Sequence, residues 1–185
     1  MCRTSPLRKH GAREYERMTS PAATYLVRRA SAADLPAVLE VLAQNQAAAP
    51  AHPPPAPGAP SERQRATWER VTGTADLTVY LAVHVVQNGD REQEREQPVG
   101  TAAMLVMPHL TYDCRPSAII EAVVVAHAYR RRGLARLLLQ HALNDARAAS
   151  CHKVQLLSHK RHADDGAHQL YRSLGFTPEA EGFRR

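Results

Sequence analysis

The sequence contains little cysteine. Its 185 residues include only Cys2, Cys114 and Cys151, and no two of them form a CxxC pair. An odd number of dispersed cysteines argues against a disulfide framework and against a zinc knuckle. Such sparse use of cysteine is typical of a reducing compartment. Because the N-terminus also lacks the apolar segment of a secretory signal, we expect a cytoplasmic location.

Long apolar runs and aromatic residues are also scarce. No apolar run approaches the roughly 18 residues that span a bilayer, which argues against a membrane partner. Aromatic residues make up 5% of the chain, too few for the stacking platforms of many nucleic-acid binders. The phosphate-binding patterns GxxxxGK[ST] and GxGxxG are absent, and so is the metal-binding pattern HExxH. We therefore expect no nucleic-acid partner and no bound metal.

The chain does contain an excess of positive charge, with a formal net charge of +6. Such an excess indicates an anionic partner, which composition alone does not identify. The length suits one domain. Residues 1–24 are expected to form a disordered N-terminal extension, and residues 25–185 the folded domain.

Hydrophobic periodicity predicts an α/β fold of mixed elements. Ser31 opens the first helix as its N-cap, with Asp34 at the third position, and Gly175 ends the last helix. The second half of the chain contains an almost unbroken apolar strand, expected to be buried on both faces. The predicted order is βααβββαβα, with strands at 25–29, 77–86, 99–107, 119–125 and 154–157 and helices at 31–42, 61–73, 134–149 and 164–174.

The most informative segment is a basic turn between that apolar strand and the helix at 134–149. It reads Arg130-Arg131-Arg132-Gly133-Leu134-Ala135. A helix N-terminus offers free backbone N–H groups and a partial positive charge, and small residues let phosphate oxygens approach. Arginine adds forked donors. The turn therefore predicts a phosphate site, although a solvated basic turn is the simpler alternative.

Two motifs in this sequence resemble those of the GCN5-related N-acetyltransferase (GNAT) family. Residues 130–135 match the family signature R/Q-x-x-G-x-G/A, and residues 167–176, which read AHQLYRSLGF, match A-x-x-x-Y-x-x-x-G-F. The resemblance covers residues 25–185. It implies a central mixed, mostly antiparallel sheet flanked by helices. It also implies acetyl transfer from acetyl-CoA to a primary amine, expected here to belong to a small molecule.

The resemblance also implies which residues bind acetyl-CoA. The backbone of Val123, Val124 and Val125 would pair with the pantetheine arm as an extra strand. The pyrophosphate would lie against Arg130, Arg131, Arg132, Gly133, Leu134 and Ala135. Two positions depart from the family: Asp164 stands where an asparagine is common, which affects its contact with pantetheine, and Arg131 stands where glycine is common.

Glu121 is the candidate general base. It is a lone carboxylate in an apolar strand, where burial disfavours the charged form, and strand alternation would put it on the same face as Val123 and Val125. The alternative is a glutamate whose carboxylate simply reaches solvent. The resemblance implies that Tyr171 protonates the leaving thiolate; the alternative is a tyrosine that only packs on the core. A backbone N–H near Val123 or Val124 would polarise the acetyl carbonyl.

Three other functions remain open at this point. The chain could be a non-catalytic CoA-binding sensor, it could acetylate an amine on a protein or peptide, or its arginines could bind nucleic acid. A homodimer is also possible. The acceptor is expected to depend on the loops around residues 47–60 and 109–115, the first of which is rich in proline.

Overall fold

A six-stranded sheet forms the centre of the protein. The computed structural model describes residues 16–20, 23–45, 58–87, 94–162, 166–180 and 182. The strands lie in chain order across the sheet, and all neighbours pair antiparallel except the parallel pair β5 and β6. They are β1 (Glu16–Ser20), β2 (Ala23–Arg29), β3 (Leu77–Gln87), β4 (Glu94–Met107), β5 (Ser117–Val125) and β6 (Lys153–Leu156).

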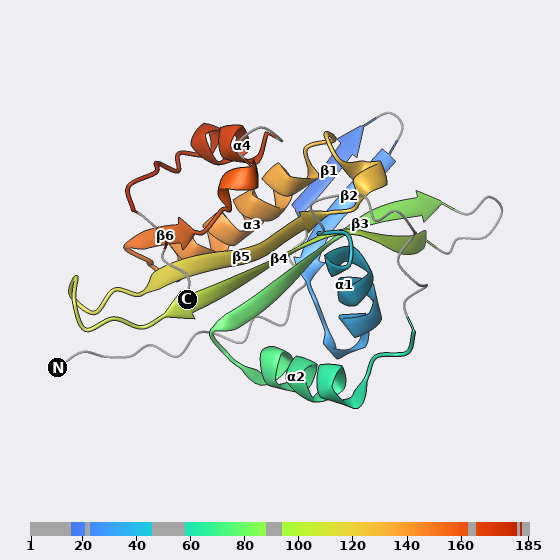
Figure 1. The fold of residues 1–185 in the computed structure, drawn as a ribbon, viewed down its shortest axis with the longest axis horizontal. Coiled ribbons are helices and arrows are strands. Elements are labelled where there is room, and N and C mark those ends of the chain that lie inside the picture. Colours follow the sequence, from blue (N-terminus) through green and yellow to red (C-terminus); the bar gives the residue numbers. More distant parts are fainter. Residues whose placement is uncertain are drawn as a thin grey trace.

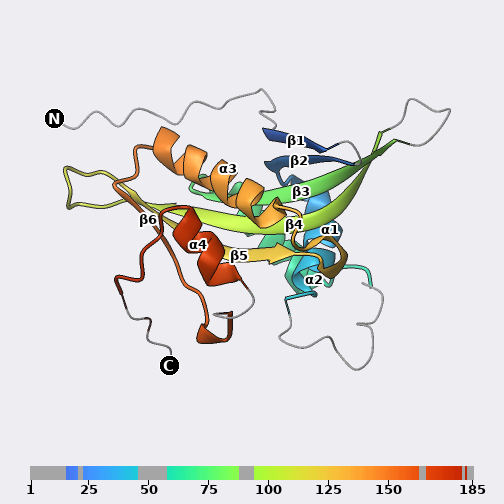
Figure 2. The ribbon, with the colours of Figure 1, turned by 90° about the horizontal axis from the view of Figure 1, so that it is seen from above.

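Helices cover both faces of this sheet, as Figures 1 and 2 show. One face carries α1 (Leu35–Leu42) and α2 (Glu62–Gly73), and the other carries α3 (Leu134–Ala148) and α4 (Ala167–Ser173). Short 3-10 turns lie at Ala32–Asp34, His127–Tyr129 and Lys160–His162. The predicted mixed α/β fold and the order βααβββαβα are confirmed, with one strand added in front.

That added strand corrects the predicted N-terminal boundary. Residues 1–24 were expected to be disordered, yet β1 pairs with β2 from Glu16 opposite Val27 to Ser20 opposite Ala23. The expectation failed because the segment shows no apolar alternation, and strand pairing through the backbone does not require it. Residues 1–15 lie outside the described part of the chain.

Two separate cores follow from the two layers of helices. The larger packs α3 against the sheet, where Tyr80, Leu138, Leu139 and Ala142 are fully buried. The smaller lies under α1 and α2 and includes Trp68. Sheet residues alternate between the two layers because successive strand side chains point to opposite faces. This alternation makes a local break in β5 consequential for the site.

Helix ends follow the capping residues expected from the sequence. Gly175 has φ of +89° immediately after α4, a conformation that favours glycine. At the start of α1, the Asp34 carboxylate accepts hydrogen bonds from Ser31 N–H (2.6 Å) and Ser31 Oγ (2.7 Å).

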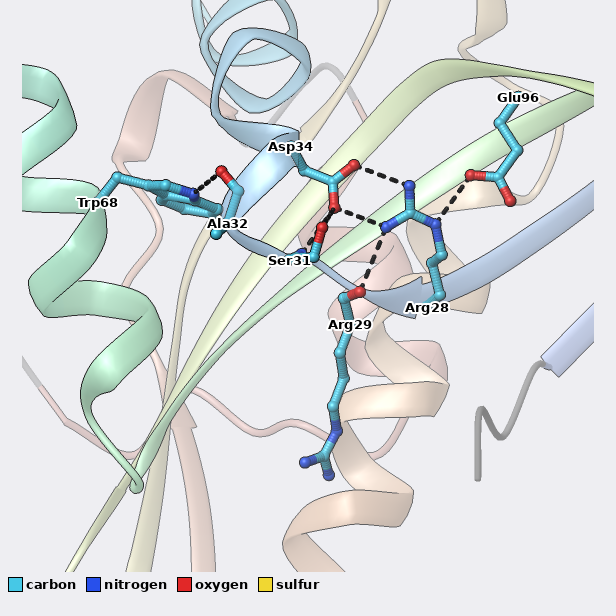
Figure 3. A network of polar contacts seen from close by, with 7 residues as sticks. All are labelled: Arg28, Arg29, Ser31, Ala32, Asp34, Trp68 and Glu96. Atoms are coloured by element: carbon cyan, nitrogen blue, oxygen red, sulfur yellow. Dashed lines mark hydrogen bonds and ion pairs between the residues drawn. The ribbon is translucent and has the colours of Figure 1, made fainter. Parts of the chain in front are cut away.

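The same carboxylate joins α1 to the sheet, as Figure 3 shows. Arg28 on β2 donates from Nη1 and Nη2 to the two Asp34 oxygens, both at 2.8 Å, and from Nε to Glu96 at 2.9 Å. The Arg28 guanidinium and the Ser31 bonds hold the pKa of Asp34 well below its usual range. Trp68 on α2 donates from Nε1 to Ala32 O at 3.1 Å, so the two helices are tied at one point.

Candidate functional site

A bulge in β5 determines how the site residues are oriented. Val124 pairs with Thr101 and Glu121 pairs with Ala103, so two residues of β5 oppose the single residue Ala102 of β4. Ala122 lies in this bulge with φ of +53°, a conformation that side chains with a Cβ rarely adopt. A bulge adds one residue to one strand and reverses the faces that follow it.

The bulge separates Glu121 from the valines. Residues directly opposite on antiparallel strands share a face. Glu121 therefore lies on the face of Ala103, toward α1 and α2, whereas Val123 and Val125 pack on the core under α3. The prediction that Glu121 shares a face with Val123 and Val125 is wrong because alternation is interrupted at Ala122.

The expected burial of this strand on both faces also fails at its centre. Glu121 and Ala122 are exposed, while Val124 is buried. Glu121 is thus not shielded by the apolar neighbours that its sequence context suggests. A role as a general base would depend instead on its position beside the bulge, facing the α1 and α2 layer.

The outer edge of β5 is open beyond the bulge. Strand β6 pairs in parallel only with residues 117–120, ending at Ile120 opposite Leu156. In the part of the chain that the structure describes, no strand pairs with the same edge of residues 121–125. Edge residues offer backbone donors and acceptors to an extended ligand. This opening leads directly to the basic turn.

That turn places the start of α3 at the end of the open edge. Gly133 is the N-cap, with φ of +83° and no side-chain cap, so no side chain of the cap satisfies the first N–H groups of the helix. Leu134 has a side chain that is 1% exposed and belongs to the core, which leaves only its backbone for a ligand. Ala135 is half-buried, and Gly133 is exposed.

The three arginines of the turn point in different directions. Arg130 donates from Nε to Val125 O at 3.2 Å and from Nη2 to Gln44 O at 3.4 Å. Arg131 has φ of +63°, and its Nη1 lies 2.6 Å from where a Cβ on Gly166 would stand. Its guanidinium therefore reaches from the start of α3 to the start of α4. The three arginines therefore do not form the single cluster that their adjacency in the sequence suggests.

Arg132 belongs to an aromatic cluster instead. It donates from Nη1 to Tyr25 Oη at 3.2 Å, and its guanidinium carbon lies 5.1 Å from the centre of the Tyr129 ring. Tyr129 donates to Gln97 Oε1 at 2.9 Å, and the His84 ring contacts both tyrosine rings, 5.1 and 5.7 Å from their centres. A cation over an aromatic face is attractive. This cluster anchors the turn to β2, β3 and β4.

Tyr171 lies on α4, over the opposite face of the sheet from Glu121. Its half-buried ring meets Phe176 edge-on with 6.2 Å between centres and packs against the core that includes Val123 and Val125. The phenylalanine of the second motif therefore packs against its tyrosine. A ligand along the open edge of β5 would be reachable from both faces. Asp164 lies outside the described residues.

A cavity of about 480 Å³ lies on the Glu121 face, between α1, α2 and the sheet. Ala122 of the bulge lines it together with Thr101 and Ala103 of β4. Of the two loops expected to form the acceptor site, residues 109–115 do not line this cavity, and residues 47–57 lie outside the described part. The described lining residues are Leu35, Val38, Leu39, Leu42, Ser61, Arg63, Gln64, Thr67, Trp68, Val71, Leu77, Val79, Thr101, Ala103 and Ala122.

Neither metal ligands nor membrane spans are found in the described residues. No group of three or more His, Cys, Asp or Glu side chains there could hold a metal ion. None of the helices in that part has both the length and the apolar character needed to cross a bilayer.

Comparison with known proteins identifies the family. Residues 46–176 match the acetyltransferase (GNAT) family, so the chain belongs to the GNAT acetyltransferases, as its two motifs indicate. A putative acetyltransferase from Agrobacterium tumefaciens str. C58 is 32% identical, with 86% of this chain and 97% of that chain covered and a TM-score of 0.66.

More distant structures share the fold. An acetyltransferase from Trypanosoma brucei is 24% identical, over 87% of this chain and 98% of that chain, with a TM-score of 0.66. The aminoglycoside N-acetyltransferase AAC(6')-Iy in complex with CoA is 16% identical, over 91% of this chain and 98% of that chain, with a TM-score of 0.65. At these identities the likeness concerns the fold alone.

Three features of the site escape the sequence analysis. The bulge has no sequence signal, because Ala122 is an ordinary strand residue rather than a glycine. Gly166 is the N-cap of α4, with φ of +90° next to Arg131, whereas the sequence prediction placed it inside the helix at 164–174. The cavity joins segments far apart in sequence. The apolar residues of α1, which are spaced three and four apart, predict a buried face but not the cavity beside it.

Proposed function

We propose that this protein transfers an acetyl group from acetyl-CoA to a primary amine of a small molecule. One observation carries the proposal: the open edge of β5 ends at a helix start that has no side-chain cap. An extended arm can pair with that edge while its phosphates meet the helix N-terminus. Family membership supports acetyl transfer, and the cavity beside the bulge supports a small acceptor.

The residues at this edge fit the proposed donor. Val123, Val124 and Val125 would bind the pantetheine arm through their backbone, and the first-turn N–H groups of α3 would bind the pyrophosphate. The carbonyl of Val125 is already engaged by Arg130, so Arg130 would support the turn and leave phosphate contact mainly to Arg131. Gly133 keeps the approach free of side-chain atoms.

The chemistry can be assigned to three groups in the chain. Acetyl-CoA supplies the acetyl group as an activated thioester. A lysine-like amine, with a pKa of about 10.4, arrives mostly protonated. Glu121 would remove its proton, directly or through water. A backbone N–H at the bulge would polarise the acetyl carbonyl, since a bulged residue lies partly outside the ladder. Tyr171 would give its hydroxyl proton to the departing sulfur.

Binding and turnover test this proposal separately. Calorimetry with acetyl-CoA should show one site per chain. A panel of primary amines should then release CoA thiol in an assay with a thiol reagent. Absence of acetyl-CoA binding would overturn the proposal, whereas binding without turnover on any amine would favour the sensor. A cytoplasmic location and a homodimer extend the proposal, and light scattering on the purified chain tests the dimer.

The arginines of the turn give a matched pair of variants. Arg131→Ala should weaken acetyl-CoA binding about 10-fold, because a charge-assisted hydrogen bond contributes about 1.5 kcal/mol. The melting temperature of Arg131→Ala should not change, since alanine has to adopt the same positive φ at this position as arginine does. Arg132→Ala removes the same charge from the same turn but breaks the contacts to Tyr25 and Tyr129. It should lower the melting temperature and change affinity less. Equal losses of affinity in both variants would contradict separate roles.

A further inference from the structure

The interior wall of the cavity beside the bulge is apolar. Leucines of α1, Trp68 and Val71 of α2, and Val79 of β3 form most of it. Its volume, about 480 Å³, lies within the range of sites for one small molecule. This volume suits one compact ligand body, and the wall around it indicates what part of an acceptor would enter.

Most polar side chains of this wall have hydrogen-bond partners within the protein. The hydroxyl of Thr101 donates to Tyr80 O at 2.9 Å, and Trp68 Nε1 donates to Ala32 O. Ser61 and Gln64 bond to each other across the start of α2. A ligand body in the cavity therefore meets few hydrogen-bonding groups, and burying its own polar groups there would be costly.

The charges around the cavity also disfavour a second positively charged group on the ligand. No lining residue among those described is a carboxylate, and the one charged residue, Arg63, is a cation on the exposed side of α2. Strand register places Glu121 opposite the lining residue Ala103. Cβ atoms of such directly opposed residues lie about 5 Å apart.

We propose that the acceptor is a monoamine with a compact apolar body, whose amine lies at Glu121 and whose body fills the cavity between α1 and α2. This inference rests on the proposed function and names its substrate class. Polyamines and other polycations are disfavoured, because a second ammonium would meet an apolar wall and Arg63 without a carboxylate to pair with.

The reaction on such an acceptor balances without another reagent. The amine nitrogen forms a bond to the acetyl carbonyl carbon, and the bond from that carbon to sulfur breaks with its electron pair going to sulfur. Of the two protons that an ammonium acceptor loses, one protonates the sulfur and one is released to solvent. The apolar body takes no part in these steps and contributes only binding.

Trp68 provides a binding signal that does not depend on turnover. It is the only tryptophan of the chain, and it lines the cavity. Cyclohexylmethylamine does not absorb at the wavelengths that excite tryptophan. Titration with this amine should change Trp68 emission in a saturable way, while titration with spermidine should not. In the turnover assay, kcat/KM for cyclohexylmethylamine should exceed that for ethylamine and for spermidine at least about 10-fold.

Filling the cavity should abolish this preference. Ala103→Leu adds bulk on the β4 wall, and Ala148→Leu adds the same atoms on the exposed side of α3 as a control. Ala103→Leu should weaken cyclohexylmethylamine binding at least about 10-fold, whereas Ala148→Leu should leave that binding and ethylamine turnover within about 2-fold. Val71→Phe fills the cavity from α2 and replaces Ala103→Leu if that variant does not fold.

The outcomes separate the two proposals. A saturable Trp68 response without thiol release from any amine supports the cavity assignment and counts against the acetyltransfer proposal. Thiol release with spermidine as the preferred acceptor overturns the inference and leaves acetyl transfer intact. A Trp68 response unchanged by both cavity-filling variants also overturns it, because the amine would then bind elsewhere.

Discussion

Asp34→Asn should lower the free energy of unfolding by about 3 kcal/mol. The substitution keeps the shape of the side chain but places an amide beside four donor groups, which are the two Arg28 Nη atoms, the Ser31 backbone N–H and the Ser31 hydroxyl. Asp34 is 11% exposed in its side chain and Arg28 is 19% exposed. Breaking a largely buried, hydrogen-bonded pair on one side leaves the other charge uncompensated, which is costly. Chemical denaturation measures the change.

Glu96→Gln provides the control on the same guanidinium. Glu96 accepts from Arg28 Nε at 2.9 Å, but its side chain is 39% exposed. Exposed ion pairs contribute about 0–1 kcal/mol, so this variant should change stability little. Equal losses from Asp34→Asn and Glu96→Gln would mean that burial of the pair does not matter here, and would contradict the prediction.

The ion pair between Asp34 and Arg28 should also make the free energy of unfolding depend on pH. Because its pKa is lowered in the folded state, the native protein binds fewer protons there than the unfolded chain does. The stabilisation is fully present above the unfolded pKa of about 3.9 and is lost as the pH falls toward the folded value. Between about pH 5 and pH 2 the native chain should therefore lose stability more steeply than Asp34→Asn.

This network matters for the site because it holds the helix layer that encloses the cavity. Asp34 precedes α1, and the bond from Trp68 to Ala32 attaches α2 to the same turn. Both helices contribute cavity walls, while Ala103, the strand partner of Glu121, lines the cavity from the sheet. A loosened α1 would thus be expected to affect amine binding before acetyl-CoA binding, since the basic turn is anchored separately through Tyr25 and Tyr129.

Local signals account for most of the elements that the sequence predicts. Apolar periodicity located α1 and α3, and Gly175 marked the end of α4 because a positive φ favours glycine. Ser31 and Asp34 predicted the start of the first helix. The partner of Asp34, however, is Arg28 on the neighbouring strand, and nothing in the residues around it distinguishes that arginine from the adjacent Arg29.

The site was predictable in its residues but not in its geometry. The motif of residues 130–135 located the turn, yet Arg130 turns back to Val125 O and Arg132 turns to the tyrosines. These directions depend on contacts between distant segments. The bulge has the largest effect, because a residue inserted at Ala122 reverses which side chains face α1. Strand alternation predicts faces only where the register is continuous.

Tyr171→Phe should reduce kcat about 100-fold or more while leaving acetyl-CoA affinity within about 2-fold. General acid catalysis contributes about 10²–10⁴-fold in rate, and phenylalanine removes only the hydroxyl. The ring should keep its edge-on contact with Phe176, so the melting temperature should change little. Thiol release under saturating acetyl-CoA measures kcat, and calorimetry measures the affinity.

Tyr112→Phe serves as the matched control, since Tyr112 is 64% exposed and stacks on His152 at 4.1 Å between ring centres, away from the cavity residues. It should leave kcat unchanged. Glu121→Gln complements these two variants. Removal of a general base should lower kcat/KM most near neutral pH. The loss should become smaller at high pH, where the amine is already neutral. A merely structural glutamate would not change the shape of that pH profile.

The same variants distinguish the enzyme from the sensor. In a sensor, Tyr171→Phe and Glu121→Gln would both retain acetyl-CoA, and the native chain would have no turnover for them to remove. In an acyltransferase with another acid, Tyr171→Phe would keep full activity, which would contradict the role assigned to the hydroxyl but not the reaction. Because Tyr171 and Glu121 lie on opposite faces of the sheet, their effects on kcat should combine at the open edge of β5, beyond the end of β6.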